Sequence, residues 1–248
     1  MKRLAAPVLL LVVAVALAGC GGSTKSTTTT TTPAPPKTTS VRVYLLLHGK
    51  VQPVARDVPD SSDLANAAFG ALLSGPTPAE QKLGLTTAMP KSASWTVKRT
   101  PDGVLSLSTE KLSRPALAQT VYTLTQFPTT ETVVVNGKQY SRSVFEDETP
   151  AILVESPLAF QVVTSPLHAT GTANTFEATF QYDLVNGAGT VVKTHFVTAT
   201  SGTGTRGTFE FSVPFTAGNH SSGSLVVYEI SAKDGSRINE IGIPLKLS

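Results

Sequence analysis

The hydrophobic pattern of this chain changes near residue 150, and this change constrains the fold more than any other feature. Between residues 41 and 148, short runs rich in β-branched residues alternate with segments whose apolar residues recur at helical spacing. From Ala151 onward, apolar and polar residues alternate with a period of two. A period of two is typical of strands with one buried face, whereas the mixed pattern is typical of an α+β layer. We therefore predict an α+β domain at 41–148 followed by an all-β domain at 151–248.

The first domain is predicted to have the order β-α-β-β-α-β, with its helices on one face of a sheet. Asp63 is suited to cap the first helix, Ser113 is suited to cap the second, and Asp102-Gly103 is a strong hairpin turn. The expected elements, in chain order, are a strand at 41–47, a helix at 64–73, paired strands at 94–99 and 104–108, a helix from 113, and a strand at 132–135.

The second domain is predicted to contain about seven short strands and no helix. Apolar residues alternate with polar ones from Phe176 to Leu184, and Asn186-Gly187 and Asp234-Gly235 are turn signals. About seven strands with turn signals at this spacing favour an immunoglobulin-like sandwich.

The N-terminus has the features of an export signal. A basic start, Met1-Lys2-Arg3, precedes an apolar run at 4–18, which is shorter than the ~20 residues that a membrane-spanning helix needs. The segment Leu17-Ala18-Gly19-Cys20 resembles the lipobox of bacterial lipoproteins. That resemblance implies a signal peptide at 1–19, cleavage before Cys20, diacylglycerol on the Cys20 thiol, and a location on the extracytoplasmic face of the cell membrane. An ordinary secretory signal with an incidental cysteine is the alternative interpretation.

Residues 20–40 are expected to form a tether between the lipidated cysteine and the folded part. Threonine fills positions 27–32, prolines follow, and few apolar residues are present to offset the entropy of ordering. Cys20 is the sole cysteine, so no disulfide within the chain can staple the domains.

The charge balance does not indicate a nucleic-acid partner. The chain has 20 basic and 17 acidic side chains, and loss of Lys2 and Arg3 with the signal would leave 18 basic against 17 acidic. A near-neutral chain without a cluster of basic and aromatic residues lacks the electrostatic footprint of nucleic-acid binding.

A segment of the first domain resembles a known family. The run Leu72-Leu73-Ser74-Gly75-Pro76-Thr77 with Glu80 matches the signature of the GerMN domain of spore formation and germination proteins. The similarity continues through Arg56, Pro90, Asp102-Gly103, Ala118-Gln119, the run 122–126 and Val135-Asn136-Gly137. It implies a domain of envelope proteins that is not known as an enzyme and is thought to mediate assembly or interaction.

The second domain resembles the immunoglobulin-like domain of bacterial spore germination proteins. The matching positions are Ser156-Pro157, 165–167, 171–173, 176–178, Gly207, Phe209, Tyr228-Glu229, Ser231, Asp234-Gly235 and Ile243-Pro244. A GerMN domain followed by this sandwich is a known pairing, so each resemblance supports the other.

Several residue patterns could carry chemistry, and each has a structural interpretation beside the functional one. The run 202–207 reads G-x-G-x-x-G, but a strand is expected after it rather than the helix that a dinucleotide site requires. The acidic run 146–150 is interpreted as a solvated hinge, with a metal site as the alternative. The aspartates at 57, 60 and 63 are assigned to loops and caps. The four histidines lie far apart in sequence, and Glu177 is either a paired structural carboxylate or a ligand.

No set of residues indicates catalysis, a metal or a cofactor. We expect a non-enzymatic, lipid-anchored envelope protein that displays two domains for binding other envelope proteins. The alternative is binding to cell-wall glycan or peptidoglycan, although aromatic residues make up only 6% of the chain and Trp95 is the sole tryptophan. An envelope enzyme is a third possibility.

Overall fold

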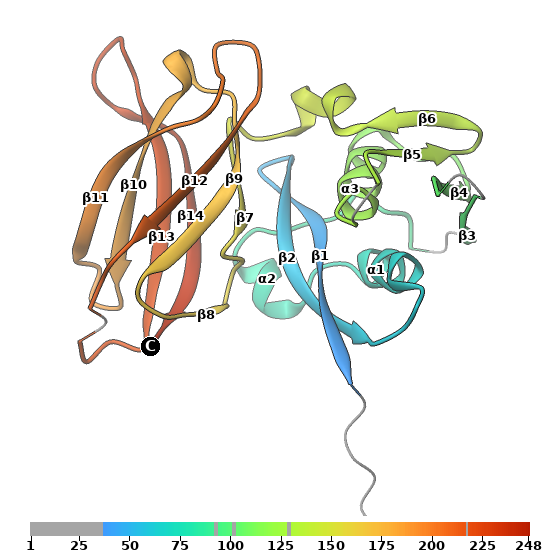
Figure 1. The fold of residues 1–248 in the computed structure, drawn as a ribbon, viewed down its shortest axis with the longest axis horizontal. Coiled ribbons are helices and arrows are strands. Elements are labelled where there is room, and N and C mark those ends of the chain that lie inside the picture. The colour runs from blue at the N-terminus through green and yellow to red at the C-terminus, as the bar shows by residue number, and fades with distance from the viewer. Residues whose placement is uncertain (1–36, 92–93, 101–102, 128–129, 217) are drawn as a thin grey trace, which may run out of the picture. The chain divides into compact units, whose positions relative to one another are not determined.

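A long antiparallel hairpin opens the first domain in the computed structural model, which describes residues 37–248 except 92–93, 101–102, 128–129 and 217 (Figure 1). β1 (Thr38–Leu47) pairs with β2 (Lys50–Pro59), and the turn between them places His48 and Gly49 at positive φ angles of 51° and 77°. The expected strand at 41–47 is therefore confirmed, but β2 was not predicted because two prolines interrupt its pattern. Proline is tolerated here because β1 and β2 form a two-stranded sheet, in which each strand is an edge.

Three α-helices pack among the described residues of the first domain, and two of them begin where the sequence predicts. α1 (Leu64–Leu73) is capped by Asp63, which accepts a hydrogen bond from the Asn66 backbone amide at 3.2 Å. α3 (Arg114–Leu124) is capped by Ser113. A short helix that was not predicted, α2 (Pro78–Lys82), follows the GPT segment and has a capping box between Thr77 and Glu80.

A four-stranded sheet completes the first domain, in the order β3-β4-β5-β6. The expected pair at 94–108 forms an antiparallel hairpin, and the expected strand at 132–135 lies parallel to its second strand. The unpredicted fourth strand pairs antiparallel with the third across Asn136-Gly137. The bounds are β3 (Trp95–Arg99), β4 (Leu105–Thr109), β5 (Thr132–Val135) and β6 (Lys138–Ser141). The predicted α+β class is confirmed, with two sheets where one was expected.

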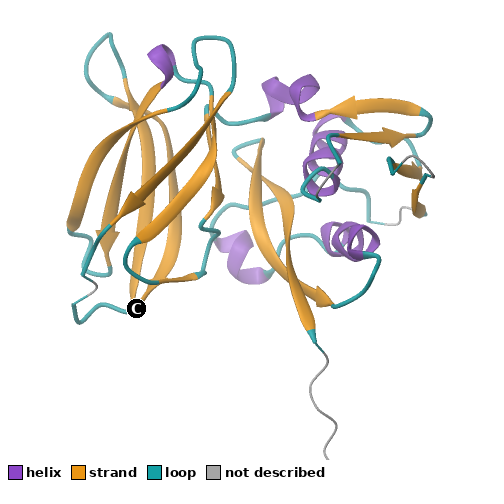
Figure 2. Ribbon diagram, viewed as in Figure 1, coloured by secondary structure: helices purple, strands orange, loops and turns teal. Residues whose placement is uncertain are grey.

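The second half of the chain folds as a sandwich of two sheets. Five strands form one sheet in the order β11-β10-β13-β14-β8, and three form the other in the order β12-β9-β7. Among the described residues of this half, the short turn η2 (Phe176–Ala178) is the one helical element, and the rest is strands and loops (Figure 2). The bounds are β7 (Ile152–Ser156), β8 (Val162–Val163), β9 (Leu167–Ala173), β10 (Thr179–Asn186), β11 (Val191–Thr198), β12 (Gly207–Val213), β13 (Ser222–Ile230) and β14 (Arg237–Leu247).

The sandwich core consists of the inward-facing side chains of both sheets, as the period of two predicts. Phe180 packs edge-on against Phe209 with ring centroids 4.8 Å apart, and Tyr182 stacks on Phe211 at 4.5 Å. The prediction that the strand begins at Phe176 is wrong. Phe176 lies in the 3-10 turn η2, and it is 64% exposed.

The predicted position of Glu177 in a strand is also wrong. It lies in η2 with a φ of 52°, exposed, rather than in a strand between core residues. Its backbone amide donates to the Thr203 hydroxyl at 3.0 Å, and no hydrogen bond or ion pair of its carboxylate is found among the described residues.

The described part of the chain forms one compact unit. Within it, a cluster of apolar side chains unites the two domains: Leu153 of β7 is fully buried among Tyr44, Val121, Tyr122 and Phe145 of the first domain. No helix in the described ranges is both long enough and apolar enough to span a bilayer.

Candidate functional site

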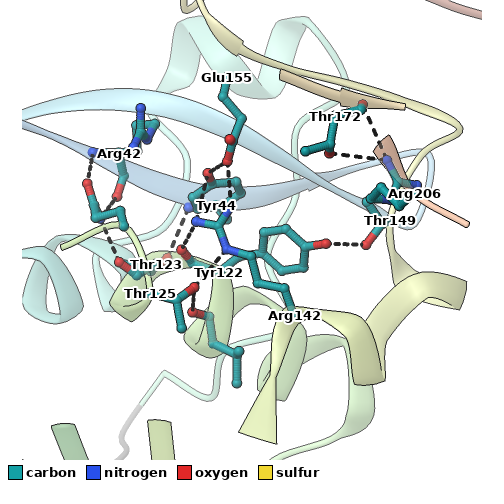
Figure 3. Close-up of polar contacts among 12 residues, drawn as sticks. Arg42, Tyr44, Tyr122, Thr123, Thr125, Arg142, Thr149, Glu155, Thr172 and Arg206 are labelled. Atoms are coloured by element: carbon teal, nitrogen blue, oxygen red, sulfur yellow. Dashed lines mark hydrogen bonds and ion pairs between the residues drawn. The ribbon is translucent and has the colours of Figure 1, made fainter. Parts of the chain in front are cut away.

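The densest group of buried polar side chains lies at the junction between the two domains. Four elements supply it: Tyr44 comes from β1, Tyr122 from α3, Glu155 from β7, and Arg142 from the 3-10 segment η1 (Arg142–Glu148) that follows β6. Figure 3 shows these side chains pointing toward one another. The junction is therefore built from side chains of both domains and of the segment that joins them.

Arg142 lies at the centre of this group. Its guanidinium carbon is 4.7 Å from the ring centroid of Tyr122 and 5.3 Å from that of Tyr44. Nη1 donates to the Glu155 carboxylate at 2.7 Å, and Nε donates to the Thr125 hydroxyl at 2.7 Å. The Tyr44 hydroxyl donates to the same carboxylate. A cation held between two aromatic rings and paired with a buried carboxylate is a strong, directional contact.

Burial and charge act in opposite directions on the groups around Arg142. Burial alone would raise the pKa of Glu155, but Arg142, the Tyr44 hydroxyl and, to a smaller extent, Arg42 lower it, and the net shift is downward. Burial is the largest cause of the pKa of the Tyr44 phenol lying well above its ordinary value. Glu155 is therefore ionised and Tyr44 is neutral at pH 7, so the tyrosine is a hydrogen-bond donor here and not a base.

A second ion pair connects the domains beside the first. Arg206, in the loop before β12, donates from Nε and Nη2 to the two carboxylate oxygens of Glu146, both at 2.9 Å. Nη2 also donates to the Pro150 carbonyl at 2.7 Å, and Asn174 donates to Glu146 at 2.9 Å. Burial would raise the pKa of Glu146, but the hydrogen bonds from Arg206 and Asn174 bring it below its ordinary value. One arginine thus holds the connecting segment and the sandwich together.

The acidic run 146–150 is therefore not the solvated hinge that the sequence suggests. Glu146 pairs with Arg206, while Asp147 and Glu148 both lie within ion-pair distance of Arg114 on α3. Thr149 is buried, and its hydroxyl lies 2.7 Å from that of Tyr122. The run is a folded connector whose carboxylates are occupied by arginines, and no group of metal-binding side chains was found among the described residues.

The other patterns singled out in the sequence lie apart from this junction or serve it structurally. The G-x-G-x-x-G run is a loop that leads into strand β12, as expected, and its Arg206 belongs to the junction. The histidines lie in a hairpin turn, in β9, in β11 and in the loop before β13. Trp95 is half-buried and packs edge-on against Phe69, with ring centroids 5.1 Å apart.

The predicted lipobox residues, Leu17, Ala18, Gly19 and Cys20, lie outside the described residues, as does most of the predicted tether. The junction residues were not identified as a site from the sequence. The two pairs join residues 13 and 60 positions apart, and neither pair follows a motif with a fixed spacing.

Comparison with known proteins identifies both halves of the chain. Residues 42–141 match the family described as "Sporulation and spore germination", and residues 151–236 match the "Immunoglobulin-like domain of bacterial spore germination". No curated protein matches the chain.

Two solved structures from Bacillus subtilis are similar to parts of it. The first GerMN domain of the sporulation protein GerM is 19% identical, with 41% of this chain and 86% of that chain covered and a TM-score of 0.32. The tandem GerMN domains of the same protein are 15% identical, with 72% of this chain and 62% of that chain covered and a TM-score of 0.35. These likenesses are too distant to transfer a function. From the two family matches, we conclude that the chain contains a GerMN domain of the sporulation and spore germination family, followed by an immunoglobulin-like domain of bacterial spore germination.

Proposed function

We propose that this chain is a lipid-anchored, non-enzymatic cell-envelope protein whose two domains, held together at their junction, bind other envelope proteins. The observation that carries the proposal is that the ionisable groups of the junction are engaged in contacts with one another. Strongly perturbed titratable groups are the usual candidates for catalysis. Here Tyr44, Arg142, Glu146 and Glu155 have perturbed pKa values, and each is engaged with another side chain of the junction.

The junction also supports a binding role directly. Two ion pairs and a shared apolar cluster restrain the domains, so a partner would meet a surface to which both domains contribute in a fixed arrangement. Preorganisation of this kind reduces the entropy that association costs. The proposed anchor at Cys20 would restrict the same surface to the envelope, and a diacylglycerol supplies the two chains that stable anchoring needs.

The anchor and the partners are tested together in the native host. Wild type, Cys20→Ala and the matched tether variant Ser23→Ala are compared by labelling with palmitate and by crosslinking in living cells followed by mass spectrometry. We expect wild type and Ser23→Ala to incorporate label and to crosslink to the same envelope proteins. Cys20→Ala should lose the label and the crosslinks.

Two outcomes would contradict the proposal. Equal labelling of Cys20→Ala would refute the anchor. Crosslinks confined to peptidoglycan in the wild type would favour the cell-wall glycan alternative over protein partners.

A further inference from the structure

A pocket of about 370 Å³ opens beside the first residues of β1, on the side of the junction where Glu155 lies. Arg42 of β1 and Phe127, which follows α3, line it from the first domain, while Glu155 and Ser156 of β7 line it from the second. Its volume is within the range of small-molecule sites. Both domains are therefore needed to form it.

Arg42 is held in place by its backbone, while its side chain has no hydrogen-bond or ion-pair partner among the residues that the structure describes. The Gln126 side chain accepts a hydrogen bond from the Arg42 amide at 2.7 Å and donates one to the Arg42 carbonyl at 2.6 Å. The Nε atom is buried and, within the described ranges, has no hydrogen-bond partner. No described carboxylate lies within 4.0 Å of the guanidinium.

The other described arginines are all engaged. Arg142 pairs with Glu155 at the junction, and four other arginines each pair with a carboxylate. Arg99 donates a hydrogen bond to the Gly103 carbonyl at 2.6 Å. The four are Arg56, Arg114, Arg206 and Arg237. Arg42 is thus the exception among the arginines that the structure describes.

The charged side chains at and beside the pocket carry one more positive than negative charge: Arg42 and Arg142 against Glu155. Glu155 is the carboxylate of this group, and its Oε1 atom accepts hydrogen bonds from both Arg142 and Tyr44. Glu155 forms its ion pair with Arg142, and the positive charge of Arg42 has no carboxylate at ion-pair distance among the described residues. A partly buried cation without a counter-charge is costly, and an anion in the pocket would remove that cost.

The rest of the lining suits an organic anion rather than a bare ion. The Gln161 side-chain oxygen accepts a hydrogen bond from the Leu158 amide at 2.7 Å, which leaves the Gln161 NH₂ group as a donor. Phe127 and Leu158 give the pocket an apolar wall. A guanidinium binds carboxylate and phosphate groups with two parallel hydrogen bonds.

We infer that this pocket binds a small organic anion, with its carboxylate or phosphate group on Arg42 and its apolar part against Phe127 and Leu158. The site is independent of the proposed anchor and of any protein partner. A free metabolite and a phospholipid headgroup could both supply such a group, and the probes below distinguish them.

Calorimetric titration of the full chain tests the site with butyrate, glycerol phosphate, and vesicles of phosphatidylglycerol or phosphatidylcholine. We expect saturable one-to-one binding of at least one anionic probe, weakened at least tenfold in Arg42→Gln. The control Arg99→Gln, an arginine on the exposed β3–β4 hairpin, should bind within twofold of wild type. Vesicle binding that requires phosphatidylglycerol would assign the ligand to the membrane, and binding of the soluble probes alone would assign it to a free anion.

Protection from arginine modification provides a second measurement that needs no variant. A dicarbonyl reagent is added to the wild-type chain with and without the tightest probe, and the modified peptides are quantified by mass spectrometry. We expect the probe to slow modification of Arg42 at least fivefold and to leave Arg99 unchanged. Failure of every anionic probe to bind, or equal modification of Arg42 with and without a bound probe, would overturn the inference.

Discussion

Replacing Arg142 by methionine should destabilise the junction more than the loss of an ordinary ion pair would. The substitution keeps the apolar stem but leaves the Glu155 carboxylate without its cation. The Arg142 and Glu155 side chains are 26% and 17% exposed, so the pair lies between the surface and buried limits. Those limits are about 0–1 and about 3–5 kcal/mol, which places this loss at about 2 kcal/mol. Contacts with two aromatic rings add about 0.5 kcal/mol each, so we expect a loss of about 3 kcal/mol in the free energy of unfolding.

Urea unfolding of the full chain, followed by two probes, measures this loss and locates it. Trp95, the sole tryptophan, lies in the first domain, so its fluorescence reports that domain, whereas far-ultraviolet circular dichroism reports both. For wild type we expect the two transitions to coincide, because the junction couples the domains. In Arg142→Met both should move to lower urea, and they should separate as the coupling weakens.

Two further variants separate the junction from general effects of losing a charge. Arg114→Met removes a solvent-exposed pair whose side chains are 48% and 61% exposed, and its urea midpoint should stay close to that of wild type. Combining Arg142→Met with Glu155→Met removes the orphaned carboxylate and should recover about 1–2 kcal/mol relative to Arg142→Met alone. If Arg142→Met loses no more than Arg114→Met, and the two probes still coincide, the junction does not couple the domains.

Three other predictions follow from single features of the fold. The pKa values of Glu146 and Glu155 are lowered by folding from an ordinary value of 4.5, so their contribution to stability is present above about pH 4.5 and is lost as the pH falls further; urea midpoints measured from pH 3 to 7 should decline only in that acid range. Gly171→Ala should cost about 2 kcal/mol or more, because its Cβ would lie 2.1 Å from a backbone carbonyl oxygen of β7, whereas Gly242→Ala, which meets nothing within 4 Å, should unfold at a midpoint close to that of wild type. Asp63→Ala should lower the unfolding free energy by about 1 kcal/mol through the lost cap of α1, and an unchanged midpoint would contradict the capping role.

The sequence predicts those parts of the fold that depend on neighbours in the chain. The caps at Asp63 and Ser113, the hairpin at β3–β4 and the alternation in the sandwich all follow from residues a few positions apart. β2 was not predicted because a proline such as Pro53 usually interrupts a strand. Pro53 is tolerated because it lies in an edge strand, opposite Tyr44 of β1. The start of the strand predicted from Phe176 was also wrong, because a periodic pattern does not show at which residue a strand begins.

The junction could not be predicted because its chemistry depends on which residues the fold brings together. Glu146 reads as one of three solvated acids, yet Arg206, 60 residues away, is its partner. Arg142 belongs to no motif in the sequence, yet two tyrosines from different elements enclose it. Sequence spacing carries no information about such pairs, because neither α-helical nor β-strand periodicity relates their positions.

The position of the junction bears on how such a chain could work. Arg142, Glu146 and Thr149 all lie in or beside the connector, so contacts that would otherwise be made by two independent domains converge on a segment of about ten residues. Loss of one contact there changes the restraint on both domains at once, because the apolar cluster around Leu153 and both ion pairs share that segment. A connector of this kind makes domain orientation a cooperative property. Variants in it should therefore impair any function that needs both domains together, while each domain keeps its own core.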